Sequence, residues 1–120
     1  MKMWMSFIFV LLILDTQSGH AVVLNRNQLA SWYPNYLTDY QFNLNSRQIT
    51  SISTGTFTGL SQLQVLWLNN NNLISLDRNI FIGLLNLEIV NLRSNPISIL
   101  QLSYVKQLCS TNPRCTIIYV

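Results

Sequence analysis

The stretch LQVLWLNNNNL at residues 63–73 fits the pattern LxxLxLxxNxL without a departure, and LEIVNLRSNPI at residues 87–97 follows it 24 positions later. Run backwards, the same frame reaches residue 39, and its apolar positions hold Phe42, Leu44, Ile49, Ile52, Phe57 and Leu60. Asp39 and Arg47 break the pattern there, as expected of a terminal repeat that lacks one neighbour. We therefore expect three repeats over residues 39–110.

This spacing predicts a short strand in each repeat. In such a strand Leu66 and Leu68 point to one face and Trp67 points to the other. One repeat cannot bury its apolar side alone, so successive repeats stack and their strands pair in parallel. The sequence thus predicts an α/β solenoid with a parallel β-sheet on its concave face and irregular turns on its convex face.

The segments GTFTGL at residues 55–60 and NIFIGL at residues 79–84 carry a phenylalanine at the same place in the frame. With the leucine pattern, they make the chain resemble the extracellular leucine-rich repeat proteins with 24-residue repeats, which include small secreted proteoglycans and Toll-type receptor ectodomains. The resemblance implies a short leucine-rich repeat solenoid that serves as a secreted recognition module. Two departures are Val105 in the phenylalanine column and the lack of flanking cysteine clusters. A diverged minimal solenoid and a piece of a longer protein both stay open.

Asn71 and Asn95 occupy the one polar position of the pattern. They fall where each strand ends and the backbone turns inward, which leaves amides and carbonyls without partners in the sheet. A buried carboxamide both donates and accepts hydrogen bonds. We therefore expect these two asparagines to be structural.

Residues 22–38 show no repeat and are expected to form an N-terminal cap, because an exposed solenoid end must be covered. The candidate covering residues are Leu29, Trp32, Tyr33, Tyr36 and Leu37.

At the other end, Tyr104, Val105 and Leu108 recur at helical spacing, which predicts a short C-terminal helix. Residues 111–120 are expected to form a final strand or cap. The register of this strand is open: the unbroken frame turns Thr116 inward, whereas simple alternation buries Ile118 and Val120.

Cys109 and Cys115 are the two cysteines of the chain. In an oxidising compartment an even pair at this separation predicts a disulfide, and two free buried thiols are the alternative.

Residues 1–21 have the tripartite form of a signal peptide, with Lys2, the apolar run SFIFVLLIL and a polar end with small residues. The run is shorter than the roughly 20 residues that span a bilayer, which makes an uncleaved anchor the lesser alternative. Cleavage after Ala21 is preferred over cleavage after Ser18. We expect a secreted, extracellular protein without stable membrane insertion.

Catalytic groups are scarce. Beyond the signal peptide the acids are Asp39, Asp77 and Glu88, and the only histidine, His20, precedes the expected cleavage site. Nucleophilic triads, paired carboxylates and metal sites need more of these residues. The basic residues are dispersed, which disfavours nucleic acid as a partner. The sequence predicts a protein that is not an enzyme and has no metal or cofactor.

Binding is then the expected activity, through the outward residues of the concave face. The predicted partner-binding residues are Trp67, Asn69, Asn43, Asn91 and Arg93, and the partner is a protein or glycan. An exposed Trp67 beside Arg93 and asparagines has the composition of an interaction hot spot. The favoured alternative is an isolated tryptophan that lies on the sheet against Val65 and Ile89 without a partner, because single apolar surface residues are common. The alternatives are self-association through the edge of the C-terminal strand and a fragment of a larger leucine-rich repeat receptor.

Overall fold

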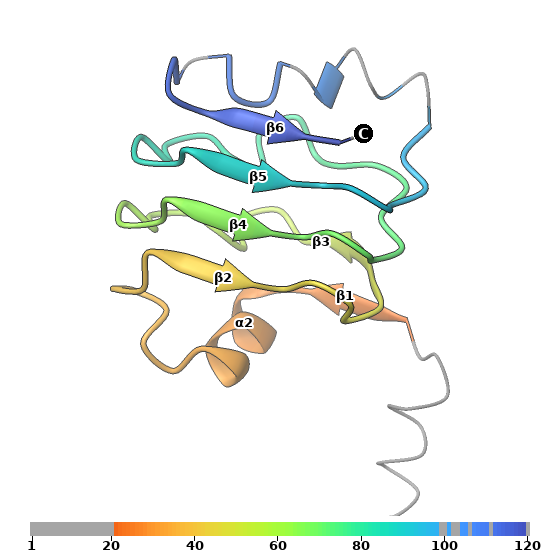
Figure 1. Cartoon of the computed structure of the whole chain (residues 1–120). Coiled ribbons are helices and arrows are strands. Elements are labelled where there is room, and N and C mark those ends of the chain that lie inside the picture. The colour runs from red at the N-terminus through yellow and green to blue at the C-terminus, as the bar shows by residue number, and fades with distance from the viewer. Residues whose placement is uncertain (1–20, 99–100, 102–103, 106, 111, 120) are drawn as a thin grey trace, which may run out of the picture.

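The computed structural model describes residues 21–98, 101, 104–105, 107–110 and 112–119, so the predicted signal peptide, apart from Ala21, lies outside the described residues. In chain order the elements are β1 (Val22–Leu24), α2 (Arg26–Trp32), β2 (Gln41–Asn43), β3 (Ile49–Ile52), β4 (Val65–Trp67), β5 (Ile89–Asn91) and β6 (Thr116–Ile118) (Figure 1).

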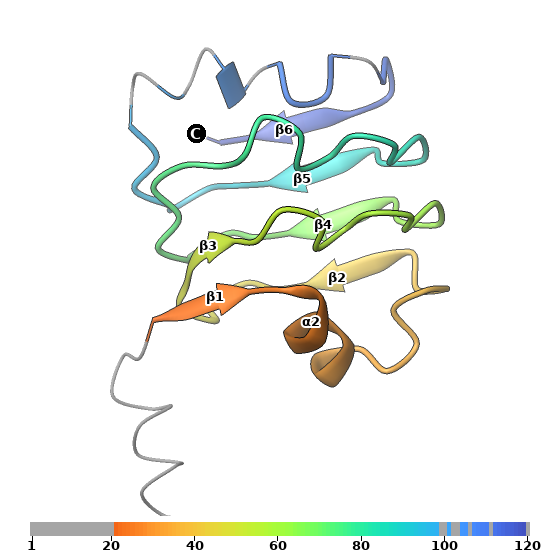
Figure 2. The same ribbon diagram turned by 180° about the vertical axis from the view of Figure 1, so that it is seen from behind.

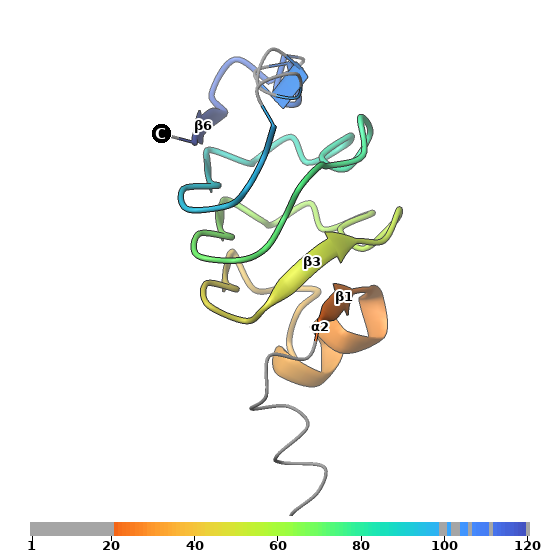
Figure 3. The ribbon, with the colours of Figure 1, turned by 90° about the vertical axis from the view of Figure 1, so that its right-hand side faces the viewer.

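The main sheet contains four parallel strands in the order β2-β4-β5-β6. Phe42 is paired with Leu66, and Leu66 with Val90, so neighbouring repeats align at the spacing that the leucines predict. This arrangement confirms the predicted α/β fold with a parallel sheet. Seen edge-on, the repeats are stacked one above another between α2 at one end and β6 at the other (Figure 3).

β6 joins the sheet in a register that neither expectation anticipated. Val90 pairs with Ile117, three residues later than the frame of the other strands requires. Ile117 packs against the core, Thr116 is exposed, and Ile118 lies beside Asn91 on the outward face. Both predictions, inward Thr116 and buried Ile118, are therefore wrong, and Val120 lies outside the described residues. The cause is a longer return from β5 to β6, which passes through a helical segment and a disulfide loop.

The core lies between the main sheet and the returning segments. Leu63, Leu66, Leu68 and Leu73 of the second repeat are fully buried. Behind them the rings of Phe57 and Phe81 stack with their centroids 6.3 Å apart. Val105, also fully buried, belongs to the same core cluster.

β1 and β3 form a second, two-stranded parallel sheet on the reverse side (Figure 2). The Val22 amide donates to the Gln48 carbonyl at 3.0 Å, and α2 follows directly. Asn25 caps this helix, since its side chain accepts from the Gln28 amide at 2.8 Å. Neither the β1–β3 sheet nor α2 was predicted from the sequence, although an asparagine before a short helix is an ordinary start signal.

Most of the predicted N-terminal covering residues do contact the core. Leu29 is fully buried, and Trp32, Tyr33 and Tyr36 pack against the core in part. Leu37 does not, because it lies in the turn closed by the bond from the Thr38 amide to the Asn35 carbonyl and is 59% exposed. Its predicted covering role is wrong.

Tyr33 also closes the edge of the sheet at β2. Its hydroxyl accepts from the Asn43 amide at 2.8 Å and donates to the Asn43 carbonyl at 2.9 Å. Its ring lies 5.0 Å from that of Phe42. One side chain thus satisfies the backbone groups that an additional strand would otherwise bond.

Asn71 connects the turns of the first two repeats. Its Oδ1 accepts from the amides of Arg47 and Ile49 at 2.9 and 3.1 Å. Its Nδ2 donates to the carbonyls of Leu44 and Leu68, both at 2.9 Å. One buried carboxamide therefore satisfies its own turn and the turn before it.

Asn95 repeats this arrangement one turn later. Its Nδ2 donates to the carbonyls of Leu68 and Leu92 at 2.9 and 3.0 Å, and its Oδ1 accepts from the Leu73 amide at 3.0 Å. These hydrogen bonds explain why Arg47 can replace the asparagine of the first repeat. Asn71 already bonds the backbone groups of that turn, and no repeat turn precedes it.

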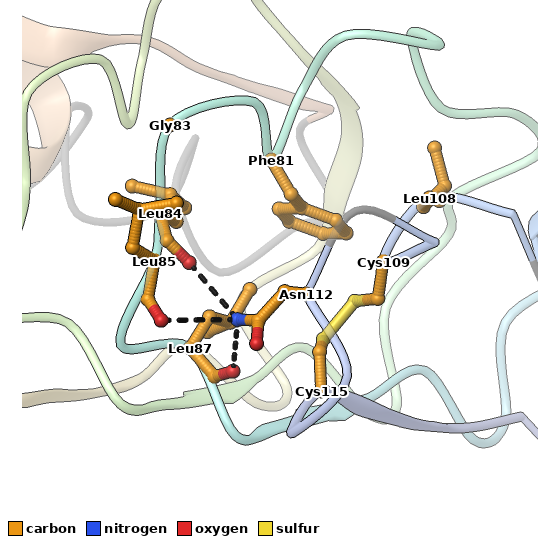
Figure 4. Close-up of a pocket in the computed structure, with 9 residues that line it drawn as sticks. All are labelled: Phe81, Gly83, Leu84, Leu85, Leu87, Leu108, Cys109, Asn112 and Cys115. Carbon is orange, nitrogen blue, oxygen red and sulfur yellow. Dashed lines mark hydrogen bonds between the residues drawn. A yellow bond between two sulfur atoms is a disulfide. The ribbon is translucent and has the colours of Figure 1, made fainter.

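The C-terminal end is held by a different set of bonds. Cys109 and Cys115 form the predicted disulfide, with their Cα atoms 5.6 Å apart. Within that loop, Asn112 Nδ2 donates to the carbonyls of Leu84, Leu85 and Leu87 at 3.3, 3.3 and 2.8 Å (Figure 4). Asn112 thus satisfies backbone carbonyls of the return segment, as Asn71 satisfies those at the strand ends.

Tyr104, in the helical segment before the disulfide, donates its hydroxyl proton to the Leu76 carbonyl. Burial raises the pKa of Tyr104 above its ordinary value of 10.0, the Asp77 carboxylate raises it further, and Arg78 lowers it. The folded chain therefore favours the neutral phenol. The stability that this preference contributes is complete below the unfolded pKa and is lost as the pH rises through the folded pKa.

We predict that Asn71→Leu destabilises the fold by several kcal/mol, because it leaves buried amides and carbonyls unsatisfied at about 1–3 kcal/mol each. Urea unfolding followed by circular dichroism measures the change. The matched control is Asn72→Leu, since Asn72 is adjacent in sequence and exposed; its midpoint should move little. Equal midpoints for the two variants would contradict the role of Asn71.

A second prediction concerns alkaline pH. Tyr104→Phe loses the bond to Leu76, so it should be less stable than the parent chain by about 1 kcal/mol at pH 8. This difference should shrink at pH 11, because the phenol of the unfolded parent ionises there while the folded chain still favours the neutral form. Urea unfolding at both pH values tests this, with Tyr40→Phe as the control because Tyr40 is 58% exposed. A difference that stays constant or grows with pH contradicts the prediction.

Candidate interaction face

The outward side chains of the main sheet form one continuous surface, which we call the open face. Asn43, Trp67, Asn91 and Ile118 lie side by side on it, one from each strand in paired register. Three of these four are predicted site residues, and the structure brings them together. Trp67 lies on β4, which has a neighbouring strand on both sides, and is half-buried.

An apolar strip runs along the middle of the open face. Val65 and Ile89 are paired neighbours on β4 and β5, and both are half-buried like Trp67. Ile118 on β6 is half-buried as well, and it lies beyond Asn91 in the row that contains Trp67. Sequence reasoning missed Ile118 because the three-residue shift of β6 was not visible in the repeat frame.

Asn43 and Asn91 flank the strip, and each also shapes its own backbone. Asn91 Oδ1 accepts from the Arg93 amide at 3.0 Å, and Asn43 Oδ1 accepts from the Asn45 amide at 3.4 Å. In both cases the side-chain oxygen accepts from the backbone amide two residues later. Asparagine forms this hydrogen bond readily where a chain turns. The carboxamide NH₂ groups are the parts of these side chains that can donate to a ligand.

Asn69 and Arg93, the other two predicted site residues, follow the strands directly. The Asn69 carbonyl accepts from the Ser46 amide at 3.1 Å, and the Arg93 carbonyl accepts from the Asn70 amide at 2.9 Å. Their backbones therefore belong to the turns, while Asn69 is half-buried and Arg93 is exposed at the border of the face.

The turns themselves are strained in the same way in each repeat. Ser46, Asn70 and Ser94 have φ angles of 55°, 58° and 58°, in the left-handed region that costs an L-residue about 1–2 kcal/mol. Asparagine tolerates this region better than most residues. This repeated conformation fixes where each strand stops, and hence the width of the open face.

The open face carries groups for non-covalent contact. Among the residues that the structure describes, there is no cluster of three or more histidine, cysteine or acidic side chains that could hold a metal ion. Arg93 is the only charged side chain among the predicted binding residues, and the remaining contacts are amide and apolar.

Hollows in the described surface lie elsewhere. One of about 560 Å³ is found at the N-terminal end, and one of about 310 Å³ lies near Tyr104. None of the five predicted partner-binding residues lines either hollow. The open face, a continuous surface across four strands, is suited to a broad contact.

None of the described helices is long and apolar enough to cross a membrane. No curated protein matches the chain at a significant level. Residues 40–97 match the family model described as leucine rich repeat, and this range contains β2 to β5 with the asparagines at their turns. This match supports a leucine-rich repeat protein.

Proposed function

We propose that the chain is a secreted, non-catalytic recognition module that binds a protein on its open face. The observation that carries this proposal is the apolar strip around Trp67, bordered by asparagine amides and Arg93. Leucine-rich repeats are typically protein-interaction modules. Protein interfaces often place an aromatic anchor at the centre of a polar rim, and such anchors supply most of the binding energy.

A protein partner fits the strip better than a glycan does. The half-buried apolar side chains of Val65 and Ile89 lie beside Trp67 on β4 and β5, and Ile118 adds an apolar side chain on β6 beyond Asn91. Burying such a surface favours an apolar partner at about 25 cal/mol per Å².

Secretion is supported by the apolar N-terminal run and by the bond between Cys109 and Cys115. Disulfides persist in oxidising compartments and are rare in the cytosol. The signal peptide over residues 1–21 and cleavage after Ala21 are parts of the same proposal.

The test removes the central aromatic side chain. Trp67→Ala should weaken binding by about 2 kcal/mol, roughly thirtyfold, for extracellular proteins captured by the parent chain and then purified. Biolayer interferometry measures the affinities, and circular dichroism checks the fold. The matched control is Ile74→Ala, since Ile74 is apolar, 62% exposed and outside the sheet. Unchanged affinity for Trp67→Ala, or an equal loss for Ile74→Ala, argues against the open face.

A second candidate function is self-association through β6. The two edges of the main sheet differ: Tyr33 bonds both backbone groups of Asn43 at β2, whereas among the described residues no side chain takes that place at β6. An uncovered strand edge can pair with the same edge of a second copy.

We expect multi-angle light scattering to report a dimer at high protein concentration if this second candidate holds. The measurement should be made with and without reductant, because the disulfide joins the loop before β6 to the helical segment. A monomer at millimolar concentration excludes self-association and leaves the recognition module unaffected.

A further inference from the structure

A hollow of the described surface lies at the N-terminal end of the stack, away from the open face. It is bounded by β1, α2 and the turn that follows β2, three segments that lie together at that end (Figure 2). Its volume of about 560 Å³ falls within the range of about 300–1,000 Å³ found for small-molecule sites. The leucine-rich repeat pattern does not account for this hollow, because its walls come largely from residues outside the repeats.

Arg47 is the charged residue of this hollow. Its guanidinium carbon lies 4.3 Å from the centre of the Trp32 ring. Its backbone is fixed, since its amide donates to Asn71 Oδ1 at 2.9 Å and its neighbours Ser46 and Gln48 have φ angles of 55° and 59°. The turn thus holds the start of the side chain, and the ring holds its end. Stacking on a ring face leaves the N–H groups at the edge of the guanidinium available as donors.

A comparison with Arg26 shows what is unusual about Arg47. Arg26 also lies over an aromatic ring, that of Tyr36 at 5.1 Å, but its guanidinium donates to the carbonyls of Gly55 and Thr58. Within the described part of the chain, the Arg47 guanidinium bonds to no carbonyl or carboxylate, and none of the described acidic residues lines the hollow. A fixed cation without a counter-charge in a hollow attracts an anion.

The other walls define the rest of the ligand. Val22 and Val23 give one apolar side, and Val23 is 52% exposed. Gln28 and Gln48 add amide groups at the border. A guanidinium matches one planar carboxylate through two parallel hydrogen bonds.

We propose that this hollow binds a small amphipathic carboxylate, with its head group on Arg47 and its apolar chain along Val22 and Val23. The site is separate from the open face and does not depend on the proposed protein partner. It gives the N-terminal end of the repeats a ligand-binding activity of its own.

The experiment titrates the purified chain with octanoate by isothermal titration calorimetry. We expect saturable binding with one site. Octanamide, which has the same chain length and no charge, should bind at least tenfold more weakly, because it lacks the charge-assisted bond. In heteronuclear NMR the indole N–H signal of Trp32 should shift during the titration, and that of Trp67 should not. Equal affinities for octanoate and octanamide, or a shift of Trp67 alone, would overturn the proposal.

Variants then test the residue itself. Arg47→Gln should weaken octanoate binding at least tenfold, and Arg47→Lys should keep part of the affinity through its charge. The matched control is Arg114→Gln, which removes an exposed arginine at the opposite end of the described fold and should leave the affinity unchanged. Circular dichroism verifies folding. If Arg47→Gln is unfolded, the affinity of Arg47→Lys tests the site instead: a partial loss supports it, and parent-like affinity contradicts it. Parent-like affinity in a folded Arg47→Gln, an equal loss in Arg114→Gln, or no saturable heat with the parent chain rejects the site. Trp67→Ala should bind octanoate normally, which separates this site from the open face.

Discussion

The carboxamides of Asn71 and Asn95, in the turns after β4 and β5, make the hydrogen bonds on which the rest of the structure depends. The chain must turn inward after three residues of strand, and the turn takes backbone amides and carbonyls away from water. Asn71 supplies two acceptor bonds and two short donor bonds to those groups, in two different repeats. The leucines determine which side of the strand is buried, but they stack in this register only because the turns between them are satisfied.

The two ends of the stack solve the problem of a missing neighbour with different chemistry. At the N-terminal end a phenol hydroxyl bonds to the backbone of β2, and α2 buries Leu29 beneath the first repeat. At the C-terminal end a disulfide closes a short loop, and Asn112 within it bonds three carbonyls of the preceding return. Neither end uses a further repeat, so both depend on side chains that the repeat pattern does not specify.

The sequence predicted the features that repeat and missed those that occur once. The leucine frame predicted the parallel sheet and its alignment through Val90, because each position of the 24-residue frame recurs in two or three repeats. The register of Ile117 was not predictable in this way, since three additional residues in a single return shift it without leaving a periodic signal. The contact between Arg47 and Trp32 joins two segments that share no pattern, and Arg47 appeared in the sequence only as a departure from the repeat.

The asparagine bonds also have a direction. Asn71 reaches back to Leu44, and Asn95 reaches back to Leu68, so each carboxamide completes the repeat made before its own. A ribosome delivers the chain in that same order, from the N-terminus onward. Each of these two turns therefore has all its hydrogen bonds only when the following repeat is in place.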